Sequence, residues 1–291
     1  MKSKKKESRA AMLFLAPNII GFLVFTVGPV LYAVYLSLTE WNMVRSPVFT
    51  GLENFVKLFR DPRFYQALKN TMVYTVGTVP VLIVLSLLLA VLVNSKVKGI
   101  SIFRTMIFIP VVASTVGSAM LWQWLLANDI GIVAYLLKIF GIKAPQFLTS
   151  SKWAMFSVIL YTIWKQLGYN MVILLGGLQA IDITYYDAAR VDGAGAVRRF
   201  FNITIPMLTP TLFFTVIMGV INSLQVFDQT HVLTKGGPNY ATTTIVYYVY
   251  VEAFTNMKMG YACAASIILF LIILLITLFQ WKGQERWVHY D

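Results

Sequence analysis

One stretch of the chain decides the class of fold: Val79-Pro80-Val81-Leu82-Ile83-Val84-Leu85-Ser86-Leu87-Leu88-Leu89. It carries no charge, and its apolar residues would surround a helix on all sides instead of forming one stripe. The apolar run that contains it extends from about 70 to 94. Because the hydrocarbon core of a bilayer is about 30 Å thick and needs about 20 mainly apolar residues per helix, this run predicts a membrane-spanning helix.

Further stretches on both sides pass the same test of length. The predicted spans are about 11–38, 70–94, 103–126, 153–180, 208–230 and 257–281. Their apolar runs are continuous rather than alternating, which favours helices over the strands of a membrane barrel. We therefore expect an all-α integral membrane protein with six transmembrane helices, in which residues 1–291 form a single transmembrane domain.

The composition excludes the other broad classes of protein. Hydrophobic residues make up 58% of the 291 residues and charged residues 12%, about half of the roughly 25% charge of soluble domains. Such high hydrophobicity also excludes intrinsic disorder. Cys263 is the single cysteine and cannot form an internal disulfide, and two histidines without a cysteine cluster predict no metal site. His231 and His289 are interpreted as ordinary loop residues.

The charge distribution predicts an orientation in the membrane. The net charge of +12 comes from basic residues in short segments between apolar runs, a pattern of cytoplasmic loops and anionic lipid contacts rather than of nucleic-acid binding. The densest basic group, residues 2–9, precedes the first span. The apolar part that follows is longer than the roughly 7–15 residues of a cleavable signal. We expect an uncleaved first span with both termini in the cytoplasm.

Between the fourth and fifth predicted spans lies a segment, residues 181–207, that is too polar to cross the bilayer and too long for a turn. Asp182 or Thr184 can cap a helix start, and Gly193 and Gly195 allow a sharp bend before a second helix. The segment is therefore predicted to form a short helix-turn-helix bracket that faces the cytoplasm.

The residues of this bracket favour two roles about equally. Small alanines let the surface of a second protein approach the backbone, and Asp187 can pair with a partner's arginine. Alternatively, the bracket is an amphipathic helix that lies on lipid through Arg190, Arg198 and Arg199.

The bracket resembles the signature loop of ABC importer permeases, which reads Glu-Ala-Ala, two residues, Asp-Gly-Ala, eight residues and Ile-x-Leu-Pro. The corresponding residues here, with the spacing kept, are Asp187-Ala188-Ala189, Asp192-Gly193-Ala194 and Ile203-Thr204-Ile205-Pro206. The two departures, Asp at 187 and Ile at 205, are chemically close to the residues they replace.

Other short motifs, in order along most of the chain, resemble the carbohydrate-uptake branch of these permeases, which includes the maltose and glycerol-3-phosphate permeases. They are Gly51-Leu52-Glu53-Asn54-Phe55, Asn70-Thr71, Phe103-Arg104-Thr105-Met106-Ile107-Phe108-Ile109-Pro110, Leu167-Gly168-Tyr169 and Leu233-Thr234-Lys235-Gly236-Gly237-Pro238.

This resemblance implies an importer-type permease fold and a subunit that translocates an oligosaccharide or related polyol across a bacterial cytoplasmic membrane. It implies a second, usually homologous permease, two cytoplasmic ATP-binding subunits and an external solute-binding protein as partners. The bracket would then be a coupling helix seated in the ATPase. The residues predicted to couple are Asp187, Ala188, Ala189, Asp192, Gly193, Ala194, Phe201 and Pro206.

The energy source must lie outside this chain. A phosphate-cradling loop ends in Gly-Lys followed by Ser or Thr, and no Gly-Lys dipeptide occurs in the sequence. We therefore expect no enzymatic activity and no cofactor in this subunit.

Polar residues inside the predicted spans mark the candidate solute path. Lys165 would cost about 2.5–3.5 kcal/mol in a span, so it either faces a cavity, partner or interface, or snorkels to the membrane surface. We expect the stretch around it to be kinked near Gly168 and to line the path. Resemblance to the maltose permease, with Tyr169 added from the same stretch, gives this solute-lining set: Gln166, Leu167, Gly168, Tyr169, Met171, Gly219, Asn222, Ser223 and Val226.

Alternatives to these assignments follow from the same residues. Asn222 and Gln225 are equally suited to hydrogen bonds between permease subunits. An ion-coupled secondary transporter is the alternative function, but it calls for internal repeats and a chain of intramembrane acids, which the sequence lacks. A membrane-embedded enzyme would need a nucleophile and base, or metal ligands, within one span.

Overall fold

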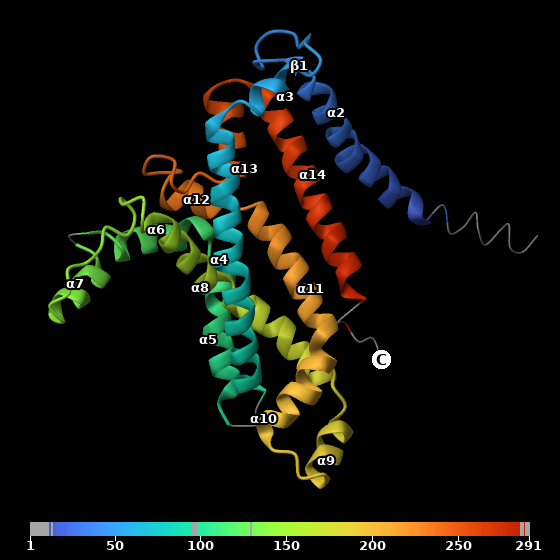
Figure 1. Ribbon diagram of the computed structural model, residues 1–291, viewed down its shortest axis with the longest axis vertical. Coiled ribbons are helices and arrows are strands. Elements are labelled where there is room, and N and C mark those ends of the chain that lie inside the picture. The colour runs from blue at the N-terminus through green and yellow to red at the C-terminus, as the bar shows by residue number, and fades with distance from the viewer. Residues whose placement is uncertain (1–11, 13, 95–97, 129, 286–287, 289–291) are drawn as a thin grey trace, which may run out of the picture. The chain divides into compact units, whose positions relative to one another are not determined.

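The computed structural model describes residues 12, 14–94, 98–128, 130–285 and 288 (Figure 1). The basic group at 2–9 and His289 lie outside these residues. The chain divides into two compact units. The smaller unit comprises Met1–Asp61 and Val249–Phe270, and the larger unit comprises Pro62–Tyr248 and Leu271–Asp291.

The smaller unit is organised around an apolar helix over Phe14–Ser37. This helix contains the π-helical turn η1 (Leu23–Val27) followed by α2 (Gly28–Ser37), and it leads to β1 (Thr39–Glu40), β2 (Val48–Phe49) and α3 (Glu53–Leu58). The two short strands pair antiparallel. The buried Asn54 amide donates hydrogen bonds to the main-chain oxygens of Ser37 (3.0 Å) and Thr39 (2.8 Å), which joins α3 to the end of the first helix.

The remaining part of the smaller unit comes from η3 (Val251–Thr255) and the first part of α14 (Met259–Gln284). Tyr261 on α14 donates a hydrogen bond to the Asp61 carboxylate at 3.1 Å. The buried Gly260 lies against the main chain of Thr39, where a side chain would not fit. A small residue at this position therefore lets α14 and the strand approach closely.

The larger unit holds the other helices, except that the last two residues of α13 belong to the smaller unit. Their bounds are α4 (Pro62–Val93), α5 (Ile100–Val112), α6 (Thr115–Leu125), α7 (Ile132–Ile139), α8 (Ala154–Ala180), α9 (Ile183–Val191), α10 (Ala196–Arg199), η2 (Phe200–Thr204), α11 (Ile205–Leu224), α12 (Asp228–Leu233) and α13 (Ile245–Tyr250). In this unit α8 packs against α4, α5 and α11. One core cluster includes Ala90, Met171, Leu174 and Leu208, so the three long helices α4, α8 and α11 share it.

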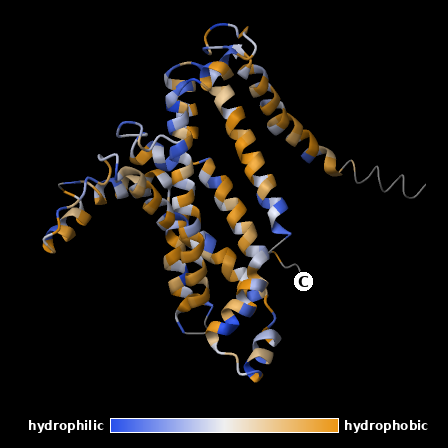
Figure 2. Cartoon of the chain, in the orientation of Figure 1, coloured by the Kyte–Doolittle hydropathy of each residue, from blue (hydrophilic) through white to orange (hydrophobic). Residues whose placement is uncertain are grey.

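The described residues contain five helices long and apolar enough to cross a membrane: Phe14–Ser37, α4, α8, Ala196–Leu224 and α14. A sixth span is present if α5 and α6 are counted as one bent span. Figure 2 shows hydrophobic residues along these helices and hydrophilic residues mainly at their ends and in the loops. The prediction of an all-helical membrane protein is confirmed, apart from one pair of two-residue strands.

The predicted third span, 103–126, is not one helix, because the chain bends by 98° between α5 and α6. Pro110 lies in the last turn of α5, and Ala113 takes an extended conformation after it. The Ser114 hydroxyl then accepts a hydrogen bond from the Gly117 amide and caps the start of α6. The Lys165 ammonium donates to the main-chain oxygens of Pro110 (2.7 Å) and Ala113, which satisfies carbonyls that the break leaves free.

The predicted fifth span, 208–230, is wrong at both ends. Its helix runs without a break from Ala196 to Leu224, and Asp228 begins a separate helix, α12. The helix passes through Pro206. The π-helical turn η2 lies directly before Pro206, and within it the Ile205 amide bonds to the Phe200 oxygen five residues back. This wider turn changes the hydrogen-bond pattern where proline lacks a donor.

Candidate functional site: a polar cavity and a cytoplasmic bracket

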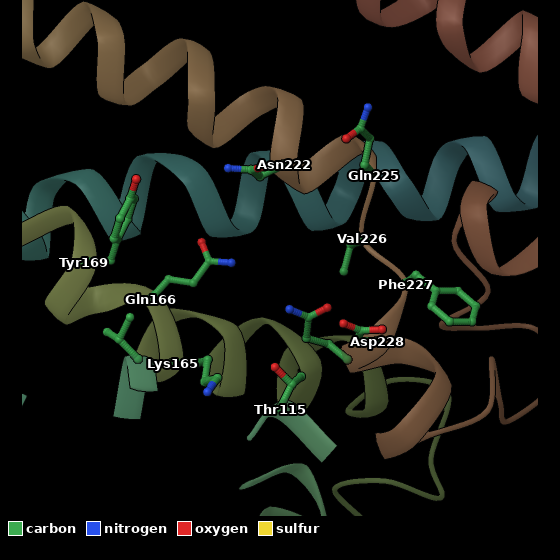
Figure 3. Close-up of a pocket in the computed structure, with 11 residues that line it drawn as sticks. Thr115, Lys165, Gln166, Tyr169, Asn222, Gln225, Val226, Phe227 and Asp228 are labelled. Atoms are coloured by element: carbon green, nitrogen blue, oxygen red, sulfur yellow. The ribbon is translucent and has the colours of Figure 1, made fainter. Parts of the chain in front are cut away.

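A cavity of about 400 Å³ lies in the larger unit between α5, α6, α8 and the junction of α11 with α12. Its lining residues are Val111, Thr115, Lys165, Gln166, Tyr169, Asn222, Gln225, Val226, Phe227, Asp228 and Gln229. Figure 3 shows Gln166 on α8 and Asn222 near the end of α11 on opposite sides of this cavity.

Two helix breaks and one continuous helix shape the cavity. The α5–α6 bend brings Val111 and Thr115 to its wall, and the end of α11 lets residues 225–229 turn across it. On α8, the spacing from Lys165 to Tyr169 is one helical turn, so both residues lie on the face toward the cavity. The main-chain groups freed at such breaks are tolerated at membrane depth where they are buried in protein or line a cavity.

The ammonium group of Lys165 is hydrogen-bonded to main-chain oxygens of the same chain. Its side chain is only 7% exposed, and its ammonium group donates to the main-chain oxygens of Pro110 and Ala113. The snorkelling alternative is therefore wrong for this conformation, because a snorkelling lysine keeps its ammonium group in water. Lys165 lines the cavity while its charged end holds the α5–α6 bend.

The other polar groups of the cavity are mostly uncharged. They are the carboxamides of Gln166, Asn222, Gln225 and Gln229, the hydroxyls of Thr115 and Tyr169, and the single carboxylate of Asp228. Carboxamides both donate and accept hydrogen bonds, as sugar hydroxyls do. Asn222 is exposed, and its side chain makes no hydrogen bond within the described part of the chain. Its amide is therefore available to a solute or to another subunit.

Four predicted lining residues, Gln166, Tyr169, Asn222 and Val226, lie at the cavity. Gly168 lies elsewhere, since it faces the backbone of α5 at Ile107 and Phe108. The helix α8 is continuous through Gly168, so no break accompanies the kink predicted there. Met171 is fully buried in the core cluster rather than at the cavity.

The remaining predicted lining residues pack against α4. Ser223 donates a hydrogen bond to the Thr75 hydroxyl at 3.1 Å, and Gly219 faces Val79. The Leu167 main-chain oxygen accepts a hydrogen bond from Ser86 at 3.3 Å. These residues hold α8 and α11 against α4 and so position the walls of the cavity without lining it.

Sequence reasoning missed Val111, Thr115, Phe227 and Gln229 as lining residues. A signal for the first two is present, because Pro110 followed by a capping Ser114 is typical of a helix end and a new helix start. For the other two, the polar run from Gln225 to Gln229 is the corresponding signal for the end of the apolar helix.

The bracket begins at the N-cap of α9. The Asp182 carboxylate accepts a hydrogen bond from the Thr184 amide at 2.9 Å, which lowers the pKa of Asp182 from its ordinary value. At the other end of α9, Gly193 adopts a positive φ of 72°, and the Ala194 amide bonds to the Ala189 oxygen at 2.8 Å. This left-handed glycine ends the helix and turns the chain toward α10.

The surface of the bracket is formed by small and charged residues. Ala188, Asp192 and Gly193 are exposed, whereas Ala189 and Ala194 are half-buried. Phe201 is 62% exposed, and its ring packs edge-to-face against Phe200. The half-buried Pro206 lies inside the following helix.

Asp187 already has a partner within the bracket. Its carboxylate forms an ion pair with Arg190 at 2.8 Å, and both side chains are more than half exposed. Exposed ion pairs of this kind contribute only about 0–1 kcal/mol. The pair can therefore rearrange at little cost when another charged surface approaches.

Comparison with known proteins assigns the chain to a family. Residues 55–282 match the family described as the binding-protein-dependent transport system inner membrane component. The chain belongs to this family. The permease is similar to the lactose transport system permease protein LacF of Rhizobium radiobacter, with 38% identity over 94% of each chain. It is also similar to the sn-glycerol-3-phosphate transport system permease protein UgpA of Agrobacterium fabrum, with 36% identity over 96% of this chain and 95% of the relative.

A solved structure agrees with this assignment. The crystal structure of a bacterial ABC transporter involved in the import of the acidic polysaccharide alginate contains a chain 27% identical to the permease, with a TM-score of 0.85. The likeness covers 98% of the permease and 99% of that chain. The predicted permease fold and multi-pass inner-membrane location are confirmed, and ATP hydrolysis belongs to a separate subunit. The alternatives of an ion-coupled transporter and a membrane enzyme are thereby set aside.

Proposed function

We propose that this permease carries a sugar, either an oligosaccharide or a related polyol, through the cavity between α8 and α11. The supporting observation is the chemistry of the cavity, whose wall carries four carboxamides, two hydroxyls and one carboxylate, while the Lys165 ammonium donates to two main-chain oxygens. Lactose, glycerol-3-phosphate and alginate, named for its relatives, share a polyhydroxylated framework.

The working unit would contain further subunits. These are a second permease subunit, two ATP-binding subunits in the cytoplasm and an external solute-binding protein. In support, the alginate transporter has been solved in complex with an alginate pentasaccharide-bound periplasmic protein, and its matching chain is 25% identical with a TM-score of 0.86. The permease would act as one transmembrane domain with both termini in the cytoplasm.

In this orientation the bracket faces the ATP-binding subunits. The proposed coupling surface comprises Asp187, Ala188, Ala189, Asp192, Gly193, Ala194, Phe201 and Pro206. Small exposed residues allow a partner to approach the backbone of α9, and the weak Asp187–Arg190 pair leaves the carboxylate free to exchange partners. Closure of the ATP-binding subunits would displace the bracket and bias the permease between inward-facing and outward-facing states.

The coupling role is tested by Asp187→Lys in the assembled importer reconstituted in liposomes. Charge reversal at this exposed position should abolish solute uptake while ATP hydrolysis continues and the complex still assembles. Glu40→Lys is the matched control, because it reverses an exposed charge outside the bracket. Normal uptake by the Asp187→Lys importer would refute the coupling role.

The solute role of the cavity is tested by Asn222→Ala and Gln166→Ala. Loss of a hydrogen-bonding group should weaken solute uptake roughly tenfold at low solute concentration. Gln179→Ala is the matched control, because Gln179 is an exposed glutamine on α8 outside the cavity. If Asn222→Ala instead prevents subunit assembly, then Asn222 serves packing between subunits and the solute role is wrong.

A further inference from the structure

A second cavity of about 580 Å³ lies behind the bracket in the larger unit, where α4 and α8 end and the Ala196–Leu224 helix begins. In Figure 1, α9 and α10 lie at this end of α4. Its polar lining groups are Asn94, Tyr186, Arg190, Arg199 and Thr204. This cavity differs from the solute cavity because its lining includes two arginines and, within the described part of the chain, no acidic residue.

The two arginines differ in their contacts. Arg190 is paired with Asp187 at the surface. In contrast, the Nε atom of Arg199 is buried and has no hydrogen-bond partner in the part of the chain that the structure describes. Buried polar atoms nearly always have a partner, and an exception calls for an explanation such as a bound ion. Because Arg199 lines the cavity and its Nε atom has no partner within the described residues, its guanidinium group is suited to an anionic ligand there.

The other polar groups of the cavity can also bind an oxyanion. The Tyr186 and Thr204 hydroxyls lie 3.0 Å apart, and the Thr204 hydroxyl has a second acceptor in the Arg199 main-chain oxygen at 3.5 Å. When Thr204 donates to Tyr186, the Tyr186 hydroxyl hydrogen and the Asn94 amide can donate outward. Arginine matches phosphate oxygens with two parallel hydrogen bonds, so these donors together fit a phosphate group.

The apolar lining indicates the source of the phosphate. Val91, Leu178 and Phe200 share the cavity with these donors. Free phosphate gains nothing from contact with apolar side chains, whereas the glycerol and upper acyl groups of a phospholipid would pack against them. Basic pockets between transmembrane helices on the cytoplasmic side are known to bind anionic headgroups.

We propose that this cavity binds a phosphate-bearing ligand, the headgroup of an anionic phospholipid, with Arg199 as its principal ligand. The choice of the cytoplasmic leaflet rests on the proposed orientation of the permease, whereas the phosphate site itself does not. A lipid bound here would contact both the bracket, through Tyr186, and the start of the helix that leads to the solute cavity.

The test uses the full-length permease, purified in detergent and titrated with phosphatidylglycerol or phosphatidylcholine, with bound lipid counted by native mass spectrometry. The wild type should retain phosphatidylglycerol in preference to phosphatidylcholine. Arg199→Gln should bind phosphatidylglycerol roughly tenfold more weakly. Arg198→Gln is the matched control, because Arg198 is exposed and does not line the cavity, and it should bind like the wild type.

A second variant and a second probe distinguish the outcomes. Tyr186→Phe removes one hydroxyl donor and should weaken lipid binding several-fold even if Arg199→Gln fails to fold. Thermal stabilisation by inorganic phosphate that is lost in Arg199→Gln, without lipid adducts, would support the phosphate site and identify its source as solution. Equal phosphatidylglycerol binding by the wild type, Arg199→Gln and Tyr186→Phe would overturn the proposal.

Discussion

The solute cavity and the bracket are built in opposite ways. The cavity walls are held by contacts inside the chain, such as the Lys165 bonds to α5 and the Ser223 bond to α4. The bracket exposes Ala188, Asp192 and Gly193, and its one ion pair lies at the surface. The cavity walls are therefore held by bonds between helices of the chain, whereas the bracket presents exposed residues that are available to a partner.

This comparison predicts two kinds of response to mutation. A change in the cavity walls should lower the free energy of unfolding, because it breaks contacts that the chain makes with itself. A change on the bracket should lower the free energy of unfolding less than a change in the cavity walls and act mainly on uptake.

The largest effect on stability is expected for Gly168→Ala. Gly168 lies so close to the backbone of Ile107 and Phe108 that an added methyl group has no space, and backbone cannot move aside as a flexible side chain can. Overpacking of this kind should cost about 3 kcal/mol. Denaturant titration in detergent micelles measures the loss, with Gly176→Ala as control, since nothing lies within 4 Å of a methyl group added at Gly176 on the same helix. Equal stability of the two variants would contradict the close packing of α5 and α8.

The next effect is expected for Lys165→Met. The substitution keeps the apolar stem but leaves the main-chain oxygens of Pro110 and Ala113 without the ammonium donor. Unpaired buried groups cost about 1–3 kcal/mol each, and relief from burying the charge offsets part of this, so the expected loss is about 2 kcal/mol. The same titration compares it with Lys152→Met, which changes an exposed lysine. A Lys165→Met protein as stable as this control would show that the bend does not depend on Lys165.

A smaller effect is expected in the bracket for Gly193→Ala. Gly193 has a positive φ and open space around it, so the cost is the left-handed backbone alone, about 1 kcal/mol. Gly195→Ala should cost less, because Gly195 has a negative φ of −67° and similarly open space. Both free energies of unfolding are measured in micelles. A larger loss for Gly195→Ala would mean that the turn is formed differently.

The smallest effect is expected at Asp182. Its pKa is lowered because the carboxylate accepts the Thr184 amide hydrogen bond. The stabilisation is therefore complete above the unfolded pKa of about 3.9 and is lost as the pH falls through the lower folded pKa. Melting curves of the wild type at about pH 6 and about pH 3 should show this loss of stability. Asp182→Asn keeps an N-cap but cannot titrate, so its melting temperature should fall less between the two pH values. An identical fall in both proteins would contradict a contribution from Asp182.

Local pattern predicted much of the fold. The apolar stretches around Val79 and Leu174 predicted α4 and α8, since length and hydropathy alone determine whether a helix can span a bilayer. The 98° bend was missed because Pro110 and Ser114 indicate where one helix ends and another begins but not the angle between them, where the distant Lys165 supplies donors. The extension of the fifth helix through Pro206 was missed because a π-helical turn changes the local pairing.

Local sequence pattern also predicted part of the candidate site. Helical spacing places Gln166 and Tyr169 on one face, and a polar Asn222 near the end of an apolar helix is visible in the sequence. Whether Gly168 or Met171 joins them depends on which helix packs on the other faces of α8. That is a property of the folded unit, where α5 covers the former and the core covers the latter.

The unbroken helix from Ala196 to Leu224 has one more consequence. At about 1.5 Å per residue, its 29 residues form a rod of about 43 Å, which begins at the turn of the bracket and ends beside the solute cavity. Coupling through such a helix is reciprocal. If a protein that binds the bracket changes the affinity of the permease for its solute, then the bound solute changes the affinity of the permease for that protein by the same factor.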